Sequence, residues 1–403
     1  MSNSTPQVRF EGFTDAWVQR VLGEVAEFSK GNGYSKGNLT SEGAPIILYG
    51  RLYTKYETVI ENVDTFVEPK DKSVISDGGE VIVPSSGETA KDISRASVVS
   101  KQGVILGGDL NIVKSDATIN PTFLAITISN GNQQKELSKR AQGKSVVHIG
   151  NSDLKNVILQ LPTLPEQTAI GNFFRTLDNC ITINQRKYDS LKKLKAAYLQ
   201  QMFPQTGECV PRIRFEGFDG EWEVKKLSEI AETYSGGTPS VAIRSYYNGK
   251  IPFIRSAEIN SSKTELFLSD EGLQNSSAKM VDIGIILYAL YGATSGEVGR
   301  SKIVGAINQA ILAIKPQMDY SSEFIAQWLR LQKQSIVSTY LQGGQGNLSA
   351  AIIKELSINI PSLEEQAAIG SYLSNLDTQM ERQSDRIEKL NQLKSAYLQR
   401  MFV

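Results

Sequence analysis

The strongest constraint on this chain is an internal repeat. Residues 8–13 (VRFEGF) return as residues 213–218 (IRFEGF), and residues 161–171 (LPTLPEQTAIG) return as residues 360–370 (IPSLEEQAAIG). The offset is 213 − 8 = 205 residues for the first match and 361 − 162 = 199 residues for the second. This period is far longer than the roughly 20–50 residues of a solenoid repeat. The sequence therefore predicts two copies of one domain, whose divergent middles indicate two different targets held at a fixed separation.

Length and composition indicate a globular protein of about two or three domains. The chain has 403 residues, and its 40% hydrophobic content is ordinary for such a protein. No apolar run approaches the roughly 18 residues of a membrane span, and residues 1–7 lack the apolar core of a signal peptide. We therefore expect a cytoplasmic protein with no membrane partner, in which Cys180 and Cys209 are free thiols.

The charges of the chain balance. Its 43 basic and 43 acidic residues cancel, which argues against a strongly basic nucleic-acid binder. Charge can still be segregated between faces of the molecule. The balance also allows a partner to supply much of any phosphate-binding surface.

The second repeated segment predicts the start of a long helix in each copy. Thr163 and Ser362 are each followed three residues later by glutamate, which fits a capping box, where hydroxyl and carboxylate satisfy free backbone N–H groups. Residues 166–203 and 365–402 contain no proline, and glycine occurs only near their start. We predict two helices of about 38 residues, each roughly 57 Å long.

Apolar residues recur along both predicted helices in alternating steps of four and three. This period, close to 3.5 residues over about four heptads, is typical of a coiled coil. Asn184 and Gln383 interrupt the seams at equivalent positions, and such a polar residue commonly fixes register at some cost in stability. We predict that the helices pair as an antiparallel coiled coil with pseudo-two-fold symmetry; alternatively, each packs on its own domain. The predicted seam consists of Ile170, Phe174, Leu177, Ile181, Asn184, Tyr188, Leu191, Tyr198 and Met202, and of Ile369, Leu373, Leu376, Met380, Gln383, Ile387, Leu390, Tyr397 and Met401.

Between the repeated segments, the two middle parts align as short strands joined by polar loops. The fold class is therefore α+β: two mixed α/β domains in tandem, each followed by a long helix. The aligned segments are 43–49 with 249–255 and 78–87 with 283–292 for strands, and those that begin at Phe123 and Phe324 for helices. The predicted boundaries are 1–161 and 205–360 for the domains, and 162–204 and 361–403 for the spacer helices.

No enzyme active site is readable in the chain. Asn120-Pro121-Thr122-Phe123 lacks the second proline of the Asn-Pro-Pro-Phe/Tyr site of adenine-N6 methyltransferases, and no Phe-x-Gly-x-Gly cofactor loop exists, so a helix-starting turn is favoured. His148 is the only histidine, and without a nucleophile motif it is expected to be structural rather than a metal ligand or part of a triad. We expect no catalytic residue and no metal site.

The order and duplication of these segments resemble the specificity (S) subunits of type I restriction-modification systems. Each long helix opens on Pro-x-Leu-x-Glu-Gln-x-Ala-Ile and closes on Tyr-Leu-Gln-x-Met-Phe, at residues 198–203 and 397–402. Residues 236–240 (GGTPS) and 345–348 (QGNL) are similar to segments of that family's target recognition domains. The first domain lacks the GGTPS segment around residues 30–36.

The resemblance implies a DNA-binding subunit without catalysis of its own. In this family each target recognition domain reads one half of a bipartite asymmetric site, while the paired helices set the gap and dock two modification subunits. Those subunits carry S-adenosylmethionine and methylate adenine N6, and restriction subunits join to cleave unmodified DNA. The implied partners are therefore double-stranded DNA, two modification subunits and restriction subunits, with no cofactor on this chain.

Loop residues that suit DNA recognition can be selected on this basis. Arginine, asparagine, glutamine and short polar side chains read base edges in the major groove, whereas phosphate contacts position the protein without choosing a sequence. The candidates are Lys30, Asn32, Tyr34, Lys36, Arg51, Tyr53, Ser85, Ser86 and Arg95 in the first domain, and Thr238, Arg244, Arg255, Ser256, Tyr291, Thr294, Arg300, Gln345 and Asn347 in the second.

Two other function classes remain open. A non-catalytic coiled-coil adaptor, with two binding domains for proteins or other ligands, would fit the frame and the charge balance. A self-contained methyltransferase would need a cofactor site that the sequence does not contain. Sequence-specific DNA binding together with a modification partner distinguishes the first prediction from the adaptor, because a scaffold forms no sequence-specific complex with DNA.

Overall fold

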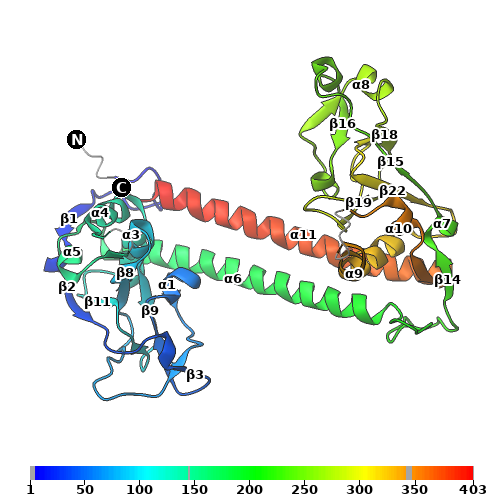
Figure 1. Cartoon of the computed structure of the whole chain (residues 1–403). Coiled ribbons are helices and arrows are strands. Elements are labelled where there is room, and N and C mark those ends of the chain that lie inside the picture. Colours follow the sequence, from blue (N-terminus) through cyan, green and yellow to red (C-terminus); the bar gives the residue numbers. More distant parts are fainter. Residues whose placement is uncertain (1–4, 144–145, 342–346, 403) are drawn as a thin grey trace. The chain divides into compact units, whose positions relative to one another are not determined.

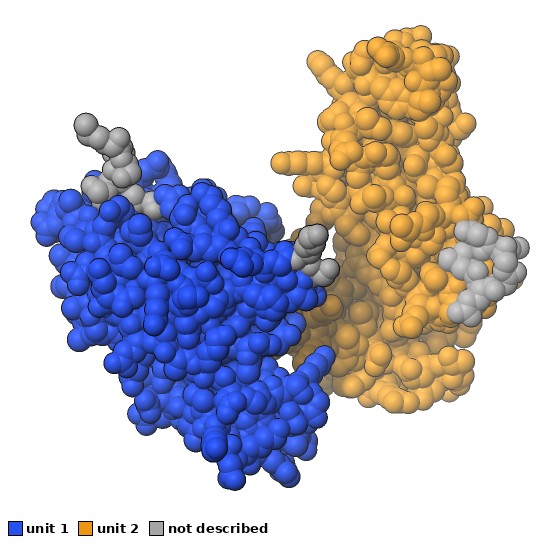
Figure 2. Space-filling model, turned by 60° about the vertical axis from the view of Figure 1, so that its left-hand side comes forward, with its two compact units in different colours: residues 1–186, 384–403 blue, residues 187–383 orange. Residues whose placement is uncertain are grey.

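A computed structural model describes residues 5–143, 146–341 and 347–402 of the chain. The chain forms two compact units, Met1–Arg186 with Ser384–Val403 (unit 1) and Lys187–Gln383 (unit 2), which Figure 2 distinguishes by colour. Each unit contains one of the two divergent bodies, the first half of one long helix and the second half of the other. This division cuts across both predicted spacer helices, because the two halves of each helix pack in different units.

Unit 1 is built on a five-stranded sheet and a smaller four-stranded sheet (Figure 1). The larger sheet has the order β2 (Ala26–Lys30), β11 (Leu110–Ser115), β7 (Val81–Pro84), β9 (Ser97–Val99) and β5 (Val59–Ile60), and the smaller β10 (Ile105–Leu106), β4 (Ala44–Ile47), β6 (Phe66–Val67) and β3 (Leu39–Thr40). Two-stranded ribbons join β1 (Val18–Val21) to β13 (Ile158–Leu161) and β8 (Ser86–Gly87) to β12 (Val147–His148). The helical segments of the body are η1 (Leu22–Glu24), η2 (Lys36–Asn38), α1 (Arg51–Thr54), α2 (Ala90–Ile93), α3 (Pro121–Ser129), α4 (Gly131–Arg140) and α5 (Asn151–Lys155).

Unit 2 repeats this construction with small differences. Its first sheet has the order β15 (Ala231–Ser235), β22 (Ile311–Pro316), β19 (Ile286–Ala289) and β20 (Val298–Arg300), and its second β17 (Leu266–Leu268), β16 (Ile251–Ile254), β21 (Gly305–Ile307) and β18 (Lys279–Val281). The ribbon pairs β14 (Glu223–Lys226) with β23 (Ser357–Ile360). The helical segments of the body are α7 (Leu227–Ile230), η3 (Arg244–Tyr247), η4 (Ser256–Glu258), α8 (Asp270–Gln274), α9 (Ser322–Leu341) and α10 (Ala350–Lys354).

The strands and helices aligned between the two copies are confirmed. β4 and β16 are equivalent, and each pairs in parallel with one later strand, β10 or β21. β7 and β19 run through the middle of their sheets, where all their residues are buried. α3 begins at Pro121 after a turn that Asn120 caps, because the Asn120 side chain accepts a hydrogen bond of 3.1 Å from the Phe123 amide. The helix-starting turn predicted at this segment is therefore correct.

The two long helices, α6 (Leu164–Gln201) and α11 (Leu363–Arg400), each contain 38 residues, as predicted. In unit 1 the first half of α6 lies antiparallel to the second half of α11, where the rings of Phe173 and Tyr397 meet edge to face at 5.0 Å. In unit 2 the rings of Tyr198 and Tyr372 meet in the same way at 5.2 Å. Because each partner has its counterpart 199 residues along the chain, the antiparallel pairing has the same register in both units.

Every residue of the predicted seam is buried or half-buried. The residues near the helix starts, however, lie in the body cores, Ile170 and Phe174 in unit 1 and Ile369 and Leu373 in unit 2. The two interpretations of the helices therefore both apply: each helix packs on its own body where it begins, and against the other helix further along.

Two lysines occupy seam positions that the apolar pattern does not include. Lys394 pairs with Asp178 at 2.5 Å in unit 1, and Lys195 pairs with Asp377 in unit 2. The Lys195 side chain is only 12% exposed, and burial lowers the pKa of its ammonium group, while the hydrogen bond to Asp377 opposes that shift. Since each ion pair joins α6 to α11, the two equivalent pairs help to fix the register of the helices.

Each long helix ends in the core of the unit in which the other helix begins. Phe402, after α11, stacks on Phe123 with ring centroids 5.8 Å apart and meets the edge of Trp17 at 6.4 Å. Phe203, after α6, packs in the same way on Phe324 and Trp222, at 5.0 and 6.2 Å. The repeated aromatic ending of the helices is therefore part of the two hydrophobic cores.

The two repeated segments of each copy are joined by a buried ion pair. Arg9 donates two hydrogen bonds, of 2.8 and 2.7 Å, to the Glu166 carboxylate, and Arg214 donates two of 2.7 Å to Glu365. Both glutamates are 1% exposed. At the start of α11, one of the two hydrogen bonds of the predicted capping box is present: the Ser362 hydroxyl accepts from the Glu365 amide at 3.3 Å. The Glu365 carboxylate binds Arg214 instead of capping the helix.

The glutamine after each of these glutamates ties the long helix to its body. The Gln167 amide group donates to the carbonyl of the motif proline at 2.9 Å and accepts from the Asn120 amide at 2.9 Å. Gln366 donates to the equivalent proline carbonyl at 3.0 Å and accepts from the Ser321 amide at 2.9 Å. The Glu-Gln pair of the repeated motif therefore attaches each helix both to the N-terminal segment and to the start of α3 or α9.

Two helical glycines in this motif let the long helices approach α3 and α9 closely. A Cβ atom on Gly370 would lie 2.7 Å from Cβ of Glu323 and 2.9 Å from the amide nitrogen of Phe324. At Gly171 the nearest atoms would be Oδ1 of Asn120 at 3.1 Å and Cβ of Thr122 at 3.3 Å. The contact is therefore tighter in unit 2 than in unit 1.

Replacing Gly370 with alanine is expected to destabilise unit 2. Overpacking costs about 1–3 kcal/mol, which exceeds the roughly 1 kcal/mol that alanine gains over glycine in a helix. Gly171→Ala is the matched control and should be close to neutral, because its milder contact is offset by the same gain. Urea unfolding followed by hydrogen exchange in peptides of each unit measures both changes; equal stability of the two variants would contradict this account.

Candidate nucleic-acid interface

In unit 1, three strands bring three loops to one end of the five-stranded sheet. β2 and β7 end there, at Lys30 and Pro84, and β11 begins there at Leu110. The antiparallel register pairs Asn111 with Lys30 and Leu110 with Pro84. The loops that continue from these strand ends therefore meet, although they are far apart in the sequence.

Main-chain hydrogen bonds hold these loops together. The Gly108 amide donates to the Gly33 carbonyl at 2.7 Å, the Ser85 amide to the Asp109 carbonyl at 2.7 Å, and the Ile149 amide to the Ser85 carbonyl at 3.0 Å. Ser85 is 6% exposed, so it contributes to the loop mainly through its main chain. We call the side chains gathered here the sheet-end cluster of unit 1; they are Lys30, Asn32, Tyr34, Ser85, Ser86, Asp109 and His148.

A further loop is attached to this cluster through Tyr34. The Tyr34 hydroxyl accepts a hydrogen bond from the Lys70 amide and shares another with the Ser73 hydroxyl, both at 2.6 Å. The Lys70 ammonium lies 4.8 Å from the centre of the Tyr34 ring, a cation–π contact. Asn32 donates to the Lys72 carbonyl at 3.3 Å. Two exposed lysines, Lys70 and Lys72, therefore accompany the predicted residues.

Other polar side chains in and near the cluster differ in whether they have a partner within the described residues. Lys30 and Lys36 are exposed and form no ion pair with any residue that the structure describes. The Ser86 hydroxyl lies 3.1 Å from Nδ1 of His148, and the Tyr53 hydroxyl donates to the Ser86 carbonyl. Tyr53, which the sequence alone does not connect with the other candidates, is thus joined to the cluster by this hydrogen bond.

Unit 2 has the same arrangement at the equivalent end of its sheet. β15 and β19 end at Ser235 and Ala289, and β22 begins at Ile311, which pairs with Ala289. The Leu290 amide donates to the Ala310 carbonyl at 2.8 Å, the counterpart of the bond between Ser85 and Asp109 in unit 1.

Side chains from three loops meet at this end of the sheet in unit 2. The Thr238 hydroxyl donates to Oε1 of Gln309 at 2.5 Å, and the Tyr291 hydroxyl donates to the main-chain carbonyl of Gln309 at 2.5 Å. The Leu348 amide donates to the Leu290 carbonyl at 3.0 Å and so brings the exposed Asn347 to the same place. Thr238, Tyr291, Gln309 and Asn347 form the sheet-end cluster of unit 2. Arg244 begins η3, after the loop that continues from Thr238, and Thr294 lies on the loop that continues from Tyr291.

Two arginine candidates of the first body have intramolecular partners. Arg51 pairs with Glu57 at 2.7 Å and with Asp64 at 2.6 Å. Hydrogen bonds from Lys55 and Arg51 lower the pKa of Asp64 to about 2. Arg95 pairs with Asp92 at 3.1 Å. In this structure the guanidinium charge of both residues is therefore compensated within unit 1.

In the second body, Arg255 and Arg300 are also paired. Arg255 contacts Glu258 at 3.1 Å and Glu265 at 2.5 Å, and hydrogen bonds to the two carboxylates raise the pKa of its guanidinium. Arg300 pairs with Glu323 at 2.6 Å, and its register with Ile286 places it at the end of β19 opposite to the cluster. Ser256 is half-buried at the start of η4, and Gln345 lies outside the described residues.

The structure brings to the clusters residues that the sequence does not single out for DNA binding, among them His148, Gln309 and Lys70. His148, which the sequence predicts to be structural, pairs with Ser86 across β8 and β12 and is exposed there. Gln309 lies before β22 and Lys70 lies after β6, and no local motif marks either residue. The position of Gln309 depends on its contact with Thr238, and that of Lys70 on its contact with Tyr34. The sequence marks Gln309 only as a polar residue that lies two positions before the buried strand β22.

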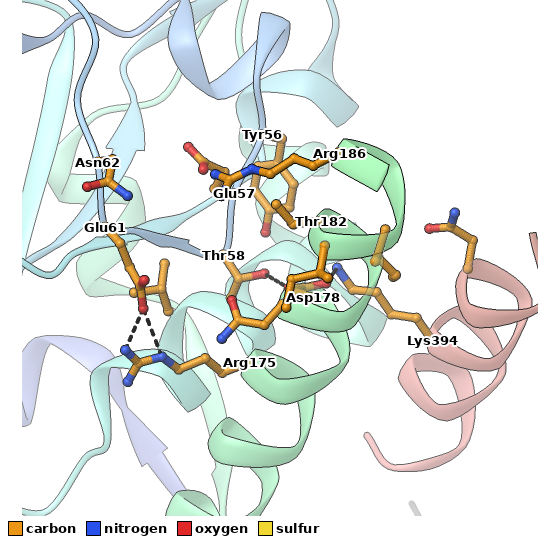
Figure 3. Close-up of a pocket in the computed structure, with 15 residues that line it drawn as sticks. Tyr56, Glu57, Thr58, Glu61, Asn62, Arg175, Asp178, Thr182, Arg186 and Lys394 are labelled. Atoms are coloured by element: carbon orange, nitrogen blue, oxygen red, sulfur yellow. Dashed lines mark hydrogen bonds and ion pairs between the residues drawn. The ribbon is translucent and has the colours of Figure 1, made fainter. Parts of the chain in front are cut away.

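A pocket of about 480 Å³ lies elsewhere in unit 1, between residues 56–62 and α6 (Figure 3). Several of its charged groups pair within the pocket: Arg175 contacts Glu61 at 2.5 Å, and Asp178 accepts from Thr58 at 3.0 Å and pairs with Lys394. These groups form ion pairs rather than a nucleophile with its base. Among the described residues, no group of three or more histidine, cysteine or acidic side chains is placed to hold a metal ion, and no helix is long and apolar enough to cross a membrane.

The fold and the two clusters define a duplicated binding protein, in which two divergent polar surfaces occupy equivalent places on one repeated frame. The chain belongs to the family described as type I restriction modification DNA specificity domain, which it matches twice, over residues 14–193 and 219–392. The two matches coincide with the two copies of the repeat, so the internal duplication is a duplication of this domain.

Known proteins that are similar to this chain are named specificity subunits of type I restriction enzymes. The type I restriction enzyme MjaIX specificity subunit of Methanocaldococcus jannaschii is 30% identical over 184 residues, which span 42% of each chain. The putative MjaX specificity subunit of the same organism is 22% identical, with 93% of this chain and 90% of that one covered. A solved S subunit from M. genitalium has the same fold, with a TM-score of 0.73, 16% identity and 99% of both chains covered. The predicted fold class is therefore confirmed.

Proposed function

We propose that this protein is the non-catalytic, sequence-specific DNA-recognition subunit of a type I restriction-modification complex. Each unit reads one half of a bipartite asymmetric site through its sheet-end cluster. The observation that carries the proposal is that both units gather polar side chains at the same end of the same sheet, and that these side chains differ. Family membership supports the class of function, and the paired clusters support the proposed place of recognition.

The chemistry of the clusters suits base recognition. Amide and hydroxyl groups such as those of Asn32, Thr238 and Gln309 can donate and accept hydrogen bonds at base edges in the major groove. Exposed lysines of unit 1, including Lys30 and Lys36, suit phosphate contacts, which position a protein without selecting a sequence. Because the chain has no net charge, we expect the isolated protein to bind DNA weakly and the partner subunits to supply much of the phosphate contact.

Two modification subunits are the proposed main partners. Exposed leucines recur at equivalent positions of the two long helices: Leu194 and Leu393 are 42% and 45% exposed, and Leu164 and Leu363 are 42% and 41% exposed. Each pair is separated by the 199-residue offset, so the frame offers two similar apolar sites, as two copies of one partner require. In the proposed complex these partners carry S-adenosylmethionine and methylate adenine N6, restriction subunits join them, and the assembly acts in the cytoplasm.

Exchanging one body is the experiment that tests this function. The chain is produced with its modification partner, and the methylated sequence is determined by methylome sequencing. Replacing residues 1–160 with the equivalent segment of another family member should change one half of the methylated site and leave the other half as it was, because the second body is untouched.

The reciprocal exchange of residues 205–360 is the matched control and should change only the other half. The repeated Arg9 and Arg214 must be retained in the exchanged segments, since their buried pairs hold the frame. Changes in both halves after a single exchange would refute the assignment of one unit to each half-site. A complex without any sequence preference would favour a scaffold instead.

A further inference from the structure

Gln309 has a position in unit 2 that no side chain has in unit 1. It precedes β22, is exposed, and contacts Thr238 of the loop that follows β15. In unit 1 the equivalent loops also touch, but through the main chain, where the Gly108 amide donates to the Gly33 carbonyl at 2.7 Å. A Cβ atom on Gly108 would lie 2.8 Å from that carbonyl oxygen, so unit 1 has no room for a side chain here.

Gln309 is held in place by one hydrogen bond to its side chain and one to its main chain. The Thr238 hydroxyl donates to its Oε1 at 2.5 Å, and the Tyr291 hydroxyl donates to its main-chain carbonyl at 2.5 Å. The following residue is fixed as well, because the Leu290 amide donates to the carbonyl of Ala310 at 2.8 Å. An exposed glutamine ordinarily loses considerable side-chain freedom when it binds a ligand, and these contacts remove part of that freedom in advance.

The groups of Gln309 that stay available define what it can bind. With Oε1 accepting from Thr238, the amide still offers one acceptor lone pair on Oε1 and two N–H donors on Nε2. One donor and one acceptor side by side match the N7 acceptor and the N6 amino donor of adenine in the major groove, the bidentate pairing that asparagine and glutamine make. Guanine presents two acceptors at that edge and cannot satisfy Oε1.

We propose that Gln309 is a specificity-determining residue of unit 2 that binds one adenine of the half-site read by this unit, with Thr238 and Tyr291 as positioning residues. The inference rests on the proposed function and goes further, because it names the base and the atoms. It also gives a physical reason for the asymmetry of the site, since unit 1 has glycine at the equivalent position.

The test uses the full complex with its modification partner and measures methylation rates on a library of sites with every single-base change. In Gln309→Ala, discrimination at one position of the second half-site should fall by about 10-fold, while the first half-site is read as in the wild type. Thr238→Val should lower discrimination at the same position to a smaller extent, and Thr238→Ser should restore it, because serine keeps the hydroxyl.

Gln317→Ala is the matched control, since this exposed glutamine follows the opposite end of β22 and donates to the Glu229 carbonyl. It should leave every base preference unchanged. Unaltered discrimination in Gln309→Ala, or an equal loss of rate on all sites, would overturn the inference while the proposed function stands. A wild-type complex without sequence preference would overturn the proposed function itself. Thermal melting confirms that the variants are folded, and Gln309→Met, which keeps the length without the amide, should repeat the alanine result.

Discussion

Replacing Glu166 with alanine is expected to lower the free energy of unfolding of unit 1 by about 3–5 kcal/mol, because it leaves the charge of Arg9 buried without a partner. The Glu166 side chain is 1% exposed and that of Arg9 is 11% exposed, so water cannot replace the lost carboxylate well. The pair also joins the N-terminal segment to the start of α6, and its loss should loosen that attachment. Urea unfolding with hydrogen exchange in peptides from both units measures the change.

The repeat supplies its own control for this variant. Glu365→Ala removes the equivalent carboxylate, whose side chain is also 1% exposed, and should destabilise unit 2 rather than unit 1. A double variant, Arg9→Met with Glu166→Leu, should regain most of the lost stability, since a buried ion pair is often replaceable by apolar side chains of similar volume. If Glu166→Ala unfolded both units together at the same urea concentration, the two cores would not be the separate structures described above.

A matched insertion in both long helices is expected to change the spacing of the recognised site. Four residues added after Gln185 in α6 and four after Ser384 in α11 lengthen each helix by about 6 Å. Since DNA rises about 3.4 Å per base pair, the unread gap should widen by one or two base pairs. The bases within each half-site should remain the same, because neither sheet-end cluster is altered. Methylome sequencing of a host that carries the complex measures the gap.

An insertion in α6 alone is the control for register. Lys394 with Asp178, and Lys195 with Asp377, hold the helices together in the two units, so helices of unequal length cannot satisfy both ion pairs. This variant should be less stable and methylate poorly. A folded double-insertion complex that methylated the original spacing would show that the helices do not set the gap.

Local patterns predicted the elements of the fold well. The capping residues, the absence of proline and the 3.5-residue period gave two helices whose 38-residue length the structure confirms. Gly-flanked apolar runs identified β4, β7, β16 and β19, because buried strands need a continuous apolar stretch between turns. In these cases the information lies within about ten neighbouring residues.

Long-range pairing was beyond such patterns. Glu166 fits a capping box locally, yet its carboxylate binds Arg9, which is 157 positions away in the sequence. Lys195 and Lys394 occupy seam positions that an apolar pattern excludes, and only their aspartate partners on the other helix make them acceptable there. A charged residue can replace an apolar one wherever a partner compensates it, and the sequence does not reveal the partner.

Loop chemistry predicts only some residues of the sheet-end clusters, because the contacts between the loops are long-range. Thr238, Tyr291 and Asn347 were selected from loop chemistry, and the sheet register brings their loops together. No local pattern marks Gln309, because its position depends on two hydrogen bonds from other loops. For Arg255 the sequence holds a local signal of a partner within the chain: Glu258 lies three residues away, the spacing of an ion pair, and the two side chains pair.

The division of the chain between its units also affects the order in which the protein can be completed during synthesis. Unit 2 is one continuous stretch, Lys187–Gln383, whereas unit 1 also requires Ser384–Val403. Trp17 and Phe123 are made early, but Phe402, which packs against both, emerges from the ribosome only after all of unit 2. The body that is translated first is therefore the last to finish folding, contrary to the usual progress of domains from the N-terminus. A nascent chain that stalls within α11 would hold a finished unit 2 beside a first body whose aromatic core is still open to chaperones and proteases.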